Sequence, residues 1–184
     1  MSGGGDDFIG DPLDIYIRDR AAVGGDVAKA VEVQRFNDGL DLTMGDYYRL
    51  VEIRDRIAPG CIIITHSYDF PPASMIGKPA EIYGFTLAGP WAKPSFSHHG
   101  WTDQMECAAI LKIMLEMFEA RMSSFAADQF NYLHVNTQCT VAPERFLNEI
   151  HLDEQGCFEV AQVINLKLLP LLDKEALSDS LPAD

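Results

Sequence analysis

The sequence predicts an α/β fold in which a mostly parallel sheet is packed against helices. Residues 61–65 form a continuous run of mostly β-branched residues, typical of a strand buried on both faces of a parallel sheet. A second apolar run at residues 132–135 indicates another strand. Between them, residues 103–125 carry apolar side chains around most of a helix circumference. Strand, helix and strand in this order favour the α/β class.

Composition sets limits on the function. A chain of 184 residues that is 47% hydrophobic is long enough for one domain with a substantial core. Its formal charge of −14 disfavours nucleic acid and anionic membrane surfaces as partners. Neither a membrane-spanning run nor a signal peptide is recognisable, so a cytoplasmic protein is expected. The four cysteines lack metal-site spacing, and we expect them to be buried thiols: Cys61, Cys107, Cys139 and Cys157.

Two helices are predicted in the first third of the chain. Residues 11–41 have a mixed pattern that allows a short helix at 26–36, and no function is assigned there. Thr43 has the character of an N-cap for a helix over residues 44–58. Pro59 and Gly60 then end that helix before the first strand.

A long loop is predicted over residues 66–100, because this segment is rich in glycine, proline and aromatic residues. Tyr68, Trp91 and Trp101 either line an apolar acyl or sugar pocket or pin the loop down as a small core, and the second interpretation is preferred. His98 and His99, with His66, raise the question of a metal. No carboxylate or cysteine spacing supports one, so neither metal nor cofactor is predicted.

The second half of the chain gives clearer patterns. Thr102 or Asp103 begins the helix that runs to residue 125, with Lys112, Glu116 and Glu119 as its solvated stripe. A strand over residues 130–136 follows, and a closing helix is expected over residues 154–168. Pro170 should prevent its continuation. The chain is therefore interpreted as one domain over residues 1–172 with a polar tail over 173–184.

His151 is the main candidate for chemistry. It belongs to the block Asn148-Glu149-Ile150-His151, which lies on a loop between the second strand and the closing helix. In open α/β sheets, ligands bind beyond the carboxyl ends of the strands, so a histidine on this loop is well placed. The alternative is that His151 only bridges loop backbone.

Three blocks of sequence resemble the SGNH (GDSL-type) hydrolase family. N-E-I-H-L-D-E-Q-G-C-F at residues 148–158 is similar to its last signature block, and G-G-D-D at residues 4–7 to its G-x-N-D block. T-H-S-Y-D-F with the later G-P-W is similar to segments of some bacterial members. The resemblance implies a flavodoxin-like three-layer sandwich with a mostly parallel sheet, apparently lacking its first strands. It also implies acyl-ester hydrolysis by serine and histidine.

The same resemblance implies roles for individual residues. His151 would be the general base, and Asn148 stands where an aspartate usually orients the imidazole. Asp6 takes the position of the oxyanion-binding asparagine, although an ionised carboxylate can only accept hydrogen bonds. The substrate-binding positions would be Gly5, His66, Tyr68 and Trp91.

The nucleophile that this family needs is missing from the sequence. Acyl transfer requires a serine on a G-D-S turn, and the Gly-Asp pairs at residues 10, 25 and 45 are followed by other residue types. The segment with the nucleophile strand would lie before Met1. Either the chain belongs to an ester hydrolase and is inactive alone, or it is a noncatalytic interaction or vestigial module. Both versions would pair with a second copy or a complementing N-terminal segment, and the hydrolase would take a small-molecule ester.

A nucleotide-binding domain of flavodoxin-like or other type is the third interpretation. It is disfavoured because no G-x-G-x-x-G or G-x-x-x-x-G-K-[ST] block follows a strand.

Overall fold

A computed structural model describes residues 8–178 of the chain, as mixed helix and strand with a small parallel sheet. Gly5 and Asp6 therefore lie outside the described residues. Twelve elements follow in chain order within this range: η1 (Asp11–Tyr16), η2 (Val27–Lys29), α1 (Val33–Ile57), β1 (Ile63–His66), η3 (Ala73–Met75), β2 (Ala80–Ile82), β3 (Phe85–Ala88), α2 (Lys93–His98), α3 (Gln104–Ala127), β4 (Tyr132–Val135), η4 (Pro143–Arg145) and α4 (Glu154–Ser178).

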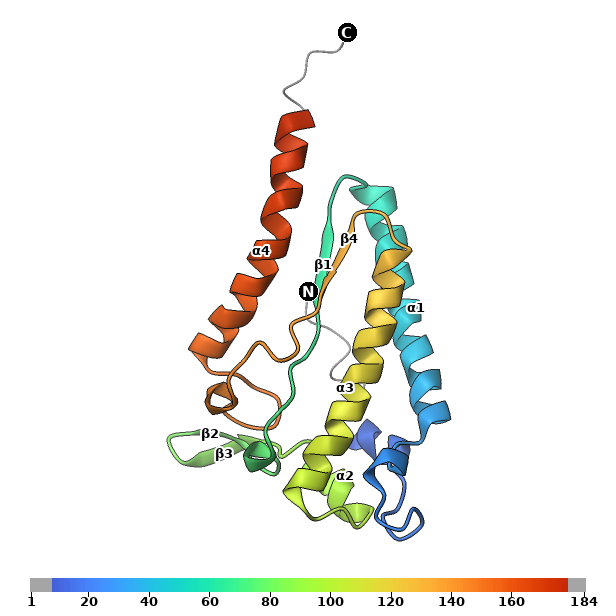
Figure 1. Cartoon of the computed structure of the whole chain (residues 1–184), viewed down its shortest axis with the longest axis vertical. Helices are drawn as coiled ribbons and strands as arrows, with labels where there is room; N and C mark the ends of the chain where they lie inside the picture. Colours follow the sequence, from blue (N-terminus) through green and yellow to red (C-terminus); the bar gives the residue numbers. More distant parts are fainter. Residues whose placement is uncertain (1–7, 179–184) are drawn as a thin grey trace.

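The centre of the fold is the parallel pair β1 and β4, which confirms the predicted strand–helix–strand order. Ile63 is paired with Tyr132, and the register continues to His66 and Val135. Helix α3 connects the strands and packs against β4, while α1 packs against α3. Figure 1 shows α4 on the other side of the two strands, where it also contacts β4. The carboxyl ends of both strands point toward the hairpin β2–β3 (Figure 1).

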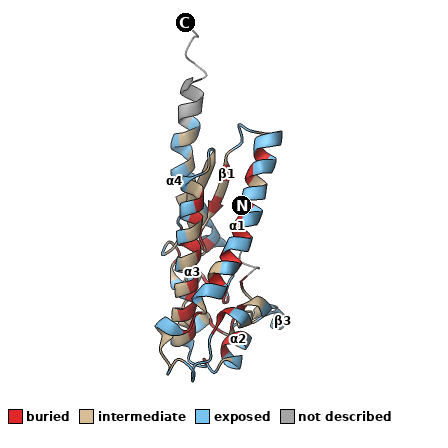
Figure 2. Cartoon of the chain, turned by 90° about the vertical axis from the view of Figure 1, so that its right-hand side faces the viewer, coloured by how far each residue is buried: buried red, intermediate tan, exposed pale blue. Residues whose placement is uncertain are grey.

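Helix α1 begins at Val33, eleven residues before the predicted start at residue 44, so that prediction is wrong. Thr43 is buried inside the helix and caps nothing. One continuous apolar face explains the early start, because buried side chains recur every three or four residues along α1 (Figure 2). This packing outweighs the low helix propensity of Gly39 and Gly45. The buried face is formed by Phe36, Leu40, Met44, Tyr47 and Val51.

The two glycines of α1 give a matched pair for testing this packing. A Cβ at Gly39 would lie 2.5 Å from the hydroxyl oxygen of Tyr16 and 3.3 Å from Phe8, whereas a Cβ at Gly45 meets nothing within 4 Å. Gly39→Ala is expected to destabilise the protein by about 1–2 kcal/mol, because overpacking outweighs the helix propensity of alanine. Gly45→Ala should stabilise it by up to about 1 kcal/mol. Urea unfolding of both variants measures the difference, and equal effects would contradict the packing of Tyr16 against α1.

The long segment between β1 and α3 is more ordered than a loop. It contains the hairpin β2–β3 and helix α2, so the prediction of an unstructured connection is wrong. Trp101 is fully buried and donates its indole N–H to the carbonyl of Arg18 at 2.8 Å, as expected for a small core. Asp103 caps α3 through the backbone N–H groups of Met105 and Glu106, which confirms the predicted start.

Helix α4 continues to Ser178 and passes Pro170, so its predicted end near residue 168 is wrong. Pro170 is exposed, and so is Leu166, whose carbonyl loses its partner at the proline. Water can solvate that carbonyl, which explains why the helix continues. From residue 154 to 172, only Gly156 of α4 is buried. Within residues 8–178, no helix is both long and apolar enough to cross a bilayer.

The cysteines correct another prediction. Only Cys107 is buried, and Cys61, Cys139 and Cys157 are exposed free thiols. Burial raises the pKa of the Cys107 thiol to about 11, so this residue stays protonated at neutral pH.

Candidate functional site

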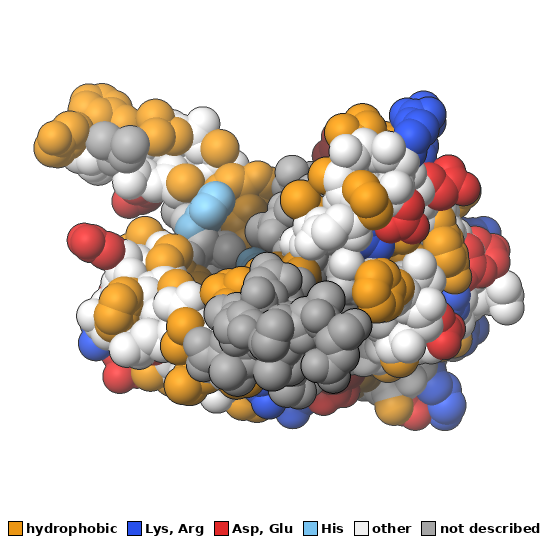
Figure 3. Space-filling model, turned by 90° about the horizontal axis from the view of Figure 1, so that it is seen from above, with side chains coloured by type: hydrophobic (Ala, Val, Ile, Leu, Met, Phe, Trp, Pro, Cys, Tyr) orange, Lys and Arg blue, Asp and Glu red, His pale blue; other side chains and the backbone are white. Residues whose placement is uncertain are grey.

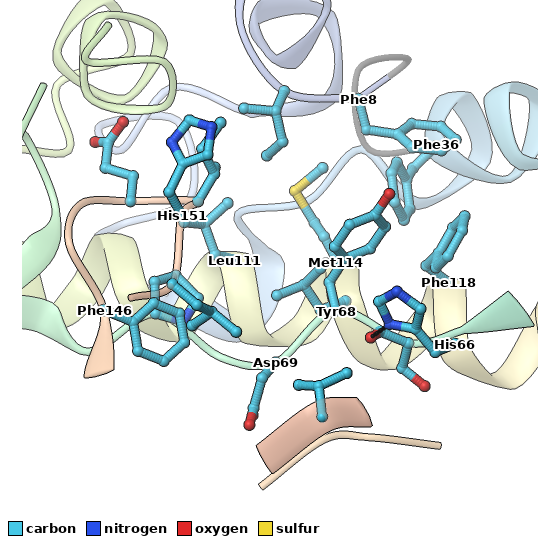
Figure 4. A pocket seen from close by; sticks show the side chains of 18 residues that line it. Phe8, Phe36, His66, Tyr68, Asp69, Leu111, Met114, Phe118, Phe146 and His151 are labelled. Atoms are coloured by element: carbon cyan, nitrogen blue, oxygen red, sulfur yellow. Dashed lines mark hydrogen bonds between the residues drawn. The ribbon is translucent and has the colours of Figure 1, made fainter. Parts of the chain in front are cut away.

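A pocket of about 350 Å³ opens where β1 ends and where the loop before α4 returns to the sheet. Hydrophobic side chains form most of its wall, and they come from α1, α3 and α4 as well as from the segments outside these helices. Figure 4 shows His151 at one end and His66 at the other, with Leu111 and Met114 between them. Seen from above, hydrophobic side chains gather along a hollow in the surface (Figure 3). The polar residues in the lining are His66, Ser67, Tyr68, Asp69, Glu149 and His151.

His151 is held in one tautomer by Asn148. The Oδ1 atom of Asn148 accepts from the backbone N–H groups of Ile150 and His151, at 3.1 and 3.0 Å. These contacts identify it as the amide oxygen, which is only an acceptor. The Nδ1 atom of His151 lies 3.0 Å from the same oxygen and must therefore carry a proton. In the neutral ring, Nε2 keeps its lone pair and can accept a proton.

Trp91 supports the ring of His151 from outside the pocket lining. The two rings meet edge to face, with their centroids 5.1 Å apart. Asn148 is 3% exposed, so the group that orients the imidazole is itself fixed. No hydrogen bond to Nε2 of His151 is found among the residues that the structure describes. This arrangement leaves a free basic nitrogen at an apolar pocket.

Glu149 fixes the loop that carries His151. Its side chain is 2% exposed. Oε2 accepts from the backbone N–H groups of Trp91 and Ala92 at 2.6 and 2.8 Å, and Oε1 accepts from Gly77 and Lys93 at 2.7 and 3.1 Å. One carboxylate thereby ties the His151 loop to the segment before β2 and to the start of α2. This role of Glu149 could not be predicted from the sequence, because its donors are backbone N–H groups, which nearly every residue type has.

Asp69 performs a similar task at the end of β1. It accepts from the backbone N–H of Cys139 at 2.7 Å and from that of Val141 at 2.7 Å. Cys139 has a positive φ of 62°, which this contact helps to hold. Asp69 therefore aligns the connection after β4 with the connection after β1, and it was not predicted.

His66 and Tyr68 share the pocket with His151, at its other end (Figure 4). Nδ1 of His66 donates to the carbonyl of Ser67 at 2.8 Å. Burial is the main cause that lowers the pKa of His66, so its ring is neutral at physiological pH. The ring of Tyr68 lies beside His66 and Phe118, at centroid distances of 6.1 and 6.0 Å.

A second polar cluster lies behind the pocket. The hydroxyl of Ser67 donates to Oε2 of Glu119, and Nε2 of His134 lies 2.8 Å from the same oxygen. Nδ1 of His134 lies 2.8 Å from the hydroxyl of Thr65. Glu119 is 8% exposed, so its predicted place in the solvated stripe of α3 is wrong. The hydroxyl oxygen of Ser67 also lies 3.4 Å from Nε2 of His134, the same nitrogen that Glu119 contacts. In a catalytic triad, by contrast, the serine and the carboxylate contact different nitrogens of the histidine. The cluster therefore binds β1, α3 and β4 together.

The structure thus brings together most of the predicted site. His66, Tyr68 and His151 line one pocket, Asn148 orients His151, and Trp91 contacts His151 from outside. Such a site can bind an apolar group and accept a proton next to it. Comparisons of the chain with protein-family models, with curated proteins and with solved structures find no match.

Proposed function

We propose that this chain is an ester-hydrolase-like protein of the SGNH type, which supplies the acyl pocket and the general base but lacks a positioned nucleophile of its own. The observation that carries the proposal is the Asn148–His151 pair, which presents a free Nε2 at an apolar pocket. The substrate would be a small-molecule ester whose acyl group enters the pocket. The three sequence blocks that resemble this family support the same choice.

The wider fold agrees with this proposal. A parallel pair of strands with helices on both sides and a pocket beyond the carboxyl ends supports a flavodoxin-like three-layer sandwich that lacks its first strands. Asn148 fulfils part of the usual role of aspartate, because its oxygen orients the ring but does not stabilise the imidazolium as a carboxylate does. We therefore expect the Asn148–His151 pair to accelerate proton abstraction less than the carboxylate–histidine pair of a complete triad does.

The missing nucleophile explains why we propose that the chain is inactive alone. Among residues 8–178, Ser67 is the one serine in the pocket lining, and its hydroxyl donates a hydrogen bond to Glu119. Attack on an ester would need a hydroxyl from a second copy or from a complementing segment. Asp6, if it occupies the oxyanion position, would repel the developing charge.

An added alcohol can stand in for this hydroxyl and test the proposal. With para-nitrophenyl butyrate and trifluoroethanol, Nε2 of His151 takes the proton of the alcohol as its oxygen attacks the carbonyl, and nitrophenolate leaves. The chain should accelerate formation of trifluoroethyl butyrate by roughly a hundredfold, the lower end of general base catalysis. His151→Gln should abolish this acceleration. Without alcohol, water is the only acyl acceptor, and hydrolysis should be slower than transfer to trifluoroethanol, because water is less acidic. Nitrophenolate absorbance and analysis of the ester product give the rates.

His98→Gln is the matched control, because His98 is an exposed histidine outside the pocket lining. With a chelator present, this variant should keep the full acceleration. A fluorophosphonate probe should leave the chain unlabelled, and labelling would contradict the absence of a nucleophile. Acceleration that survives His151→Gln would contradict the base. If neither the wild-type chain nor His151→Gln accelerates the transfer, the chain is a noncatalytic interaction module. The hydrogen bond from the Ser67 hydroxyl to Glu119 favours this alternative, because it engages the hydroxyl in the structure.

A further inference from the structure

We propose that Asp14, His98 and His99 form a binding site for one divalent transition-metal ion, with Zn²⁺ as the expected occupant. One ligand atom from each residue lies within 4.8 Å of the others. Asp14 belongs to η1, and the two histidines are the last residue and the C-cap of α2, 84 and 85 residues later in the chain. The site is therefore built by the fold, and none of its three residues lines the pocket that contains His151.

The contacts of His99 are the observation that points to a cation. Its side chain is 15% exposed, and Nδ1 lies 2.8 Å from a carboxylate oxygen of Asp19. Nε2 lies 2.9 Å from the carbonyl oxygen of Asp14 and 3.3 Å from its Oδ1. A neutral imidazole has a single N–H, so it can satisfy only one of these two sides. The other side needs either a second proton or a bound cation.

The geometry suits a tetrahedral ion. With Zn–N and Zn–O bonds of about 2.0–2.1 Å, neighbouring ligand atoms lie ~3.3 Å apart. Nε2 of His99 and Oδ1 of Asp14 already have this separation, at 3.3 Å. Nδ1 of His98 is closer to the same oxygen, at 2.7 Å, but the His98 side chain is 70% exposed and free to move outward. Water can complete the coordination.

Asp19 adds a feature that metal-binding histidines commonly have. A ligating histidine usually donates its other ring N–H to a carboxylate, which fixes the tautomer and makes the ligating nitrogen more basic. Asp19 accepts from Nδ1 of His99 and so leaves the lone pair of Nε2 on the side of Asp14. Two imidazoles and one carboxylate favour Zn²⁺, Co²⁺ or Ni²⁺ over Mg²⁺ or Ca²⁺.

The sequence alone did not predict this metal site. His98 and His99 are adjacent, and no carboxylate follows at the spacing of a metal motif, which is why no metal was predicted. The two carboxylates come from the first twenty residues, which carry no helix or strand pattern that would place them beside α2.

Cobalt titration tests the proposal directly. The chelator-treated protein, with its exposed thiols alkylated, should bind one equivalent of Co²⁺ and show a visible d–d spectrum without a thiolate charge-transfer band. His98→Gln and His99→Gln should each weaken binding by at least tenfold. Asp19→Asn, which removes no ligand, should weaken it by roughly 10–100-fold. Zn²⁺ should displace the cobalt and raise the Tm of the wild-type protein.

His151→Gln is the control, since it removes a histidine but leaves the three ligands, and its titration should match that of the wild type. His98 is largely exposed, so His98→Gln should remain folded, which circular dichroism will check. The proposal is overturned if millimolar Co²⁺ does not bind, or if binding is unchanged in both the His98 and His99 variants.

Discussion

Replacing Glu149 with alanine is expected to lower the free energy of unfolding on the order of 3–5 kcal/mol, since each buried N–H left without a partner costs about 1–3 kcal/mol. Four backbone N–H groups share this carboxylate, and water can reach only some of them after the change. The loss should also release the His151 loop from α2. Urea unfolding gives the change in stability, and amide hydrogen exchange at Trp91 and Ala92 reports the release.

Glu149→Gln separates charge from shape. Glutamine keeps one oxygen and so serves one pair of donors, but its NH₂ group faces the other pair. We therefore expect this variant to lose more than half of the stability that Glu149→Ala loses. Glu144→Ala, in η4 on the same connection, is a control for general effects of removing a carboxylate. Near-wild-type stability of Glu149→Gln would contradict the importance of the four contacts.

Glu119→Gln is expected to destabilise the protein by about 2–3 kcal/mol at neutral pH, because hydrogen bonds to a charged acceptor contribute about 1.5–3 kcal/mol each. Burial raises the pKa of Glu119, but hydrogen bonds from Ser123, Ser67 and His134 outweigh it, so the net shift is downward. A lowered pKa stabilises the folded state above the unfolded value near 4.5. The difference between wild type and variant should be complete at pH 7 and shrink as the pH falls below about 4.5.

Urea unfolding at several pH values checks this second prediction. The control is Glu116→Gln on the same helix. Glu116 is exposed, and its carboxylate oxygen forms a long ion pair of 3.8 Å with Nζ of Lys112, at i,i+4 spacing. Its effect should stay below about 0.5 kcal/mol at every pH. A pH-independent loss in Glu119→Gln would mean that shape rather than charge holds the cluster together.

The elements that could be predicted from the sequence are those whose own apolar residues form a clear pattern. β1, β4 and α3 were expected because each is apolar where it meets the core, and Asp103 marks the start of α3. The hairpin β2–β3 was missed because its second strand, β3, is exposed throughout, which leaves no alternation of apolar and polar residues to detect. Pro170 misled the prediction of α4, because the cost of a proline depends on whether solvent can reach the carbonyl that it leaves free.

Some residues of the candidate site could be predicted from the sequence and others could not. His151 and Asn148 are three residues apart, so a local block of sequence was enough to find them. Glu149 and Asp69 accept hydrogen bonds from backbone N–H groups that are 56 to 72 residues away in the chain, and almost any residue type can supply such a donor. The spacing of Glu119 from the other polar residues of its helix predicted an exposed position. Only the approach of Ser67 and His134 shows that this position is buried.

The cluster around Glu119 also has a consequence for the order in which the protein folds. His134 is only 15 residues from Glu119 along the chain, whereas Ser67 is 52 residues from Glu119 and Thr65 is 69 from His134. Contacts between near neighbours close small loops and form early, and distant ones wait for them. Helix α3 and strand β4 should therefore form a first unit in the transition state. Strand β1 joins it late, and its arrival completes both the sheet and the floor of the pocket.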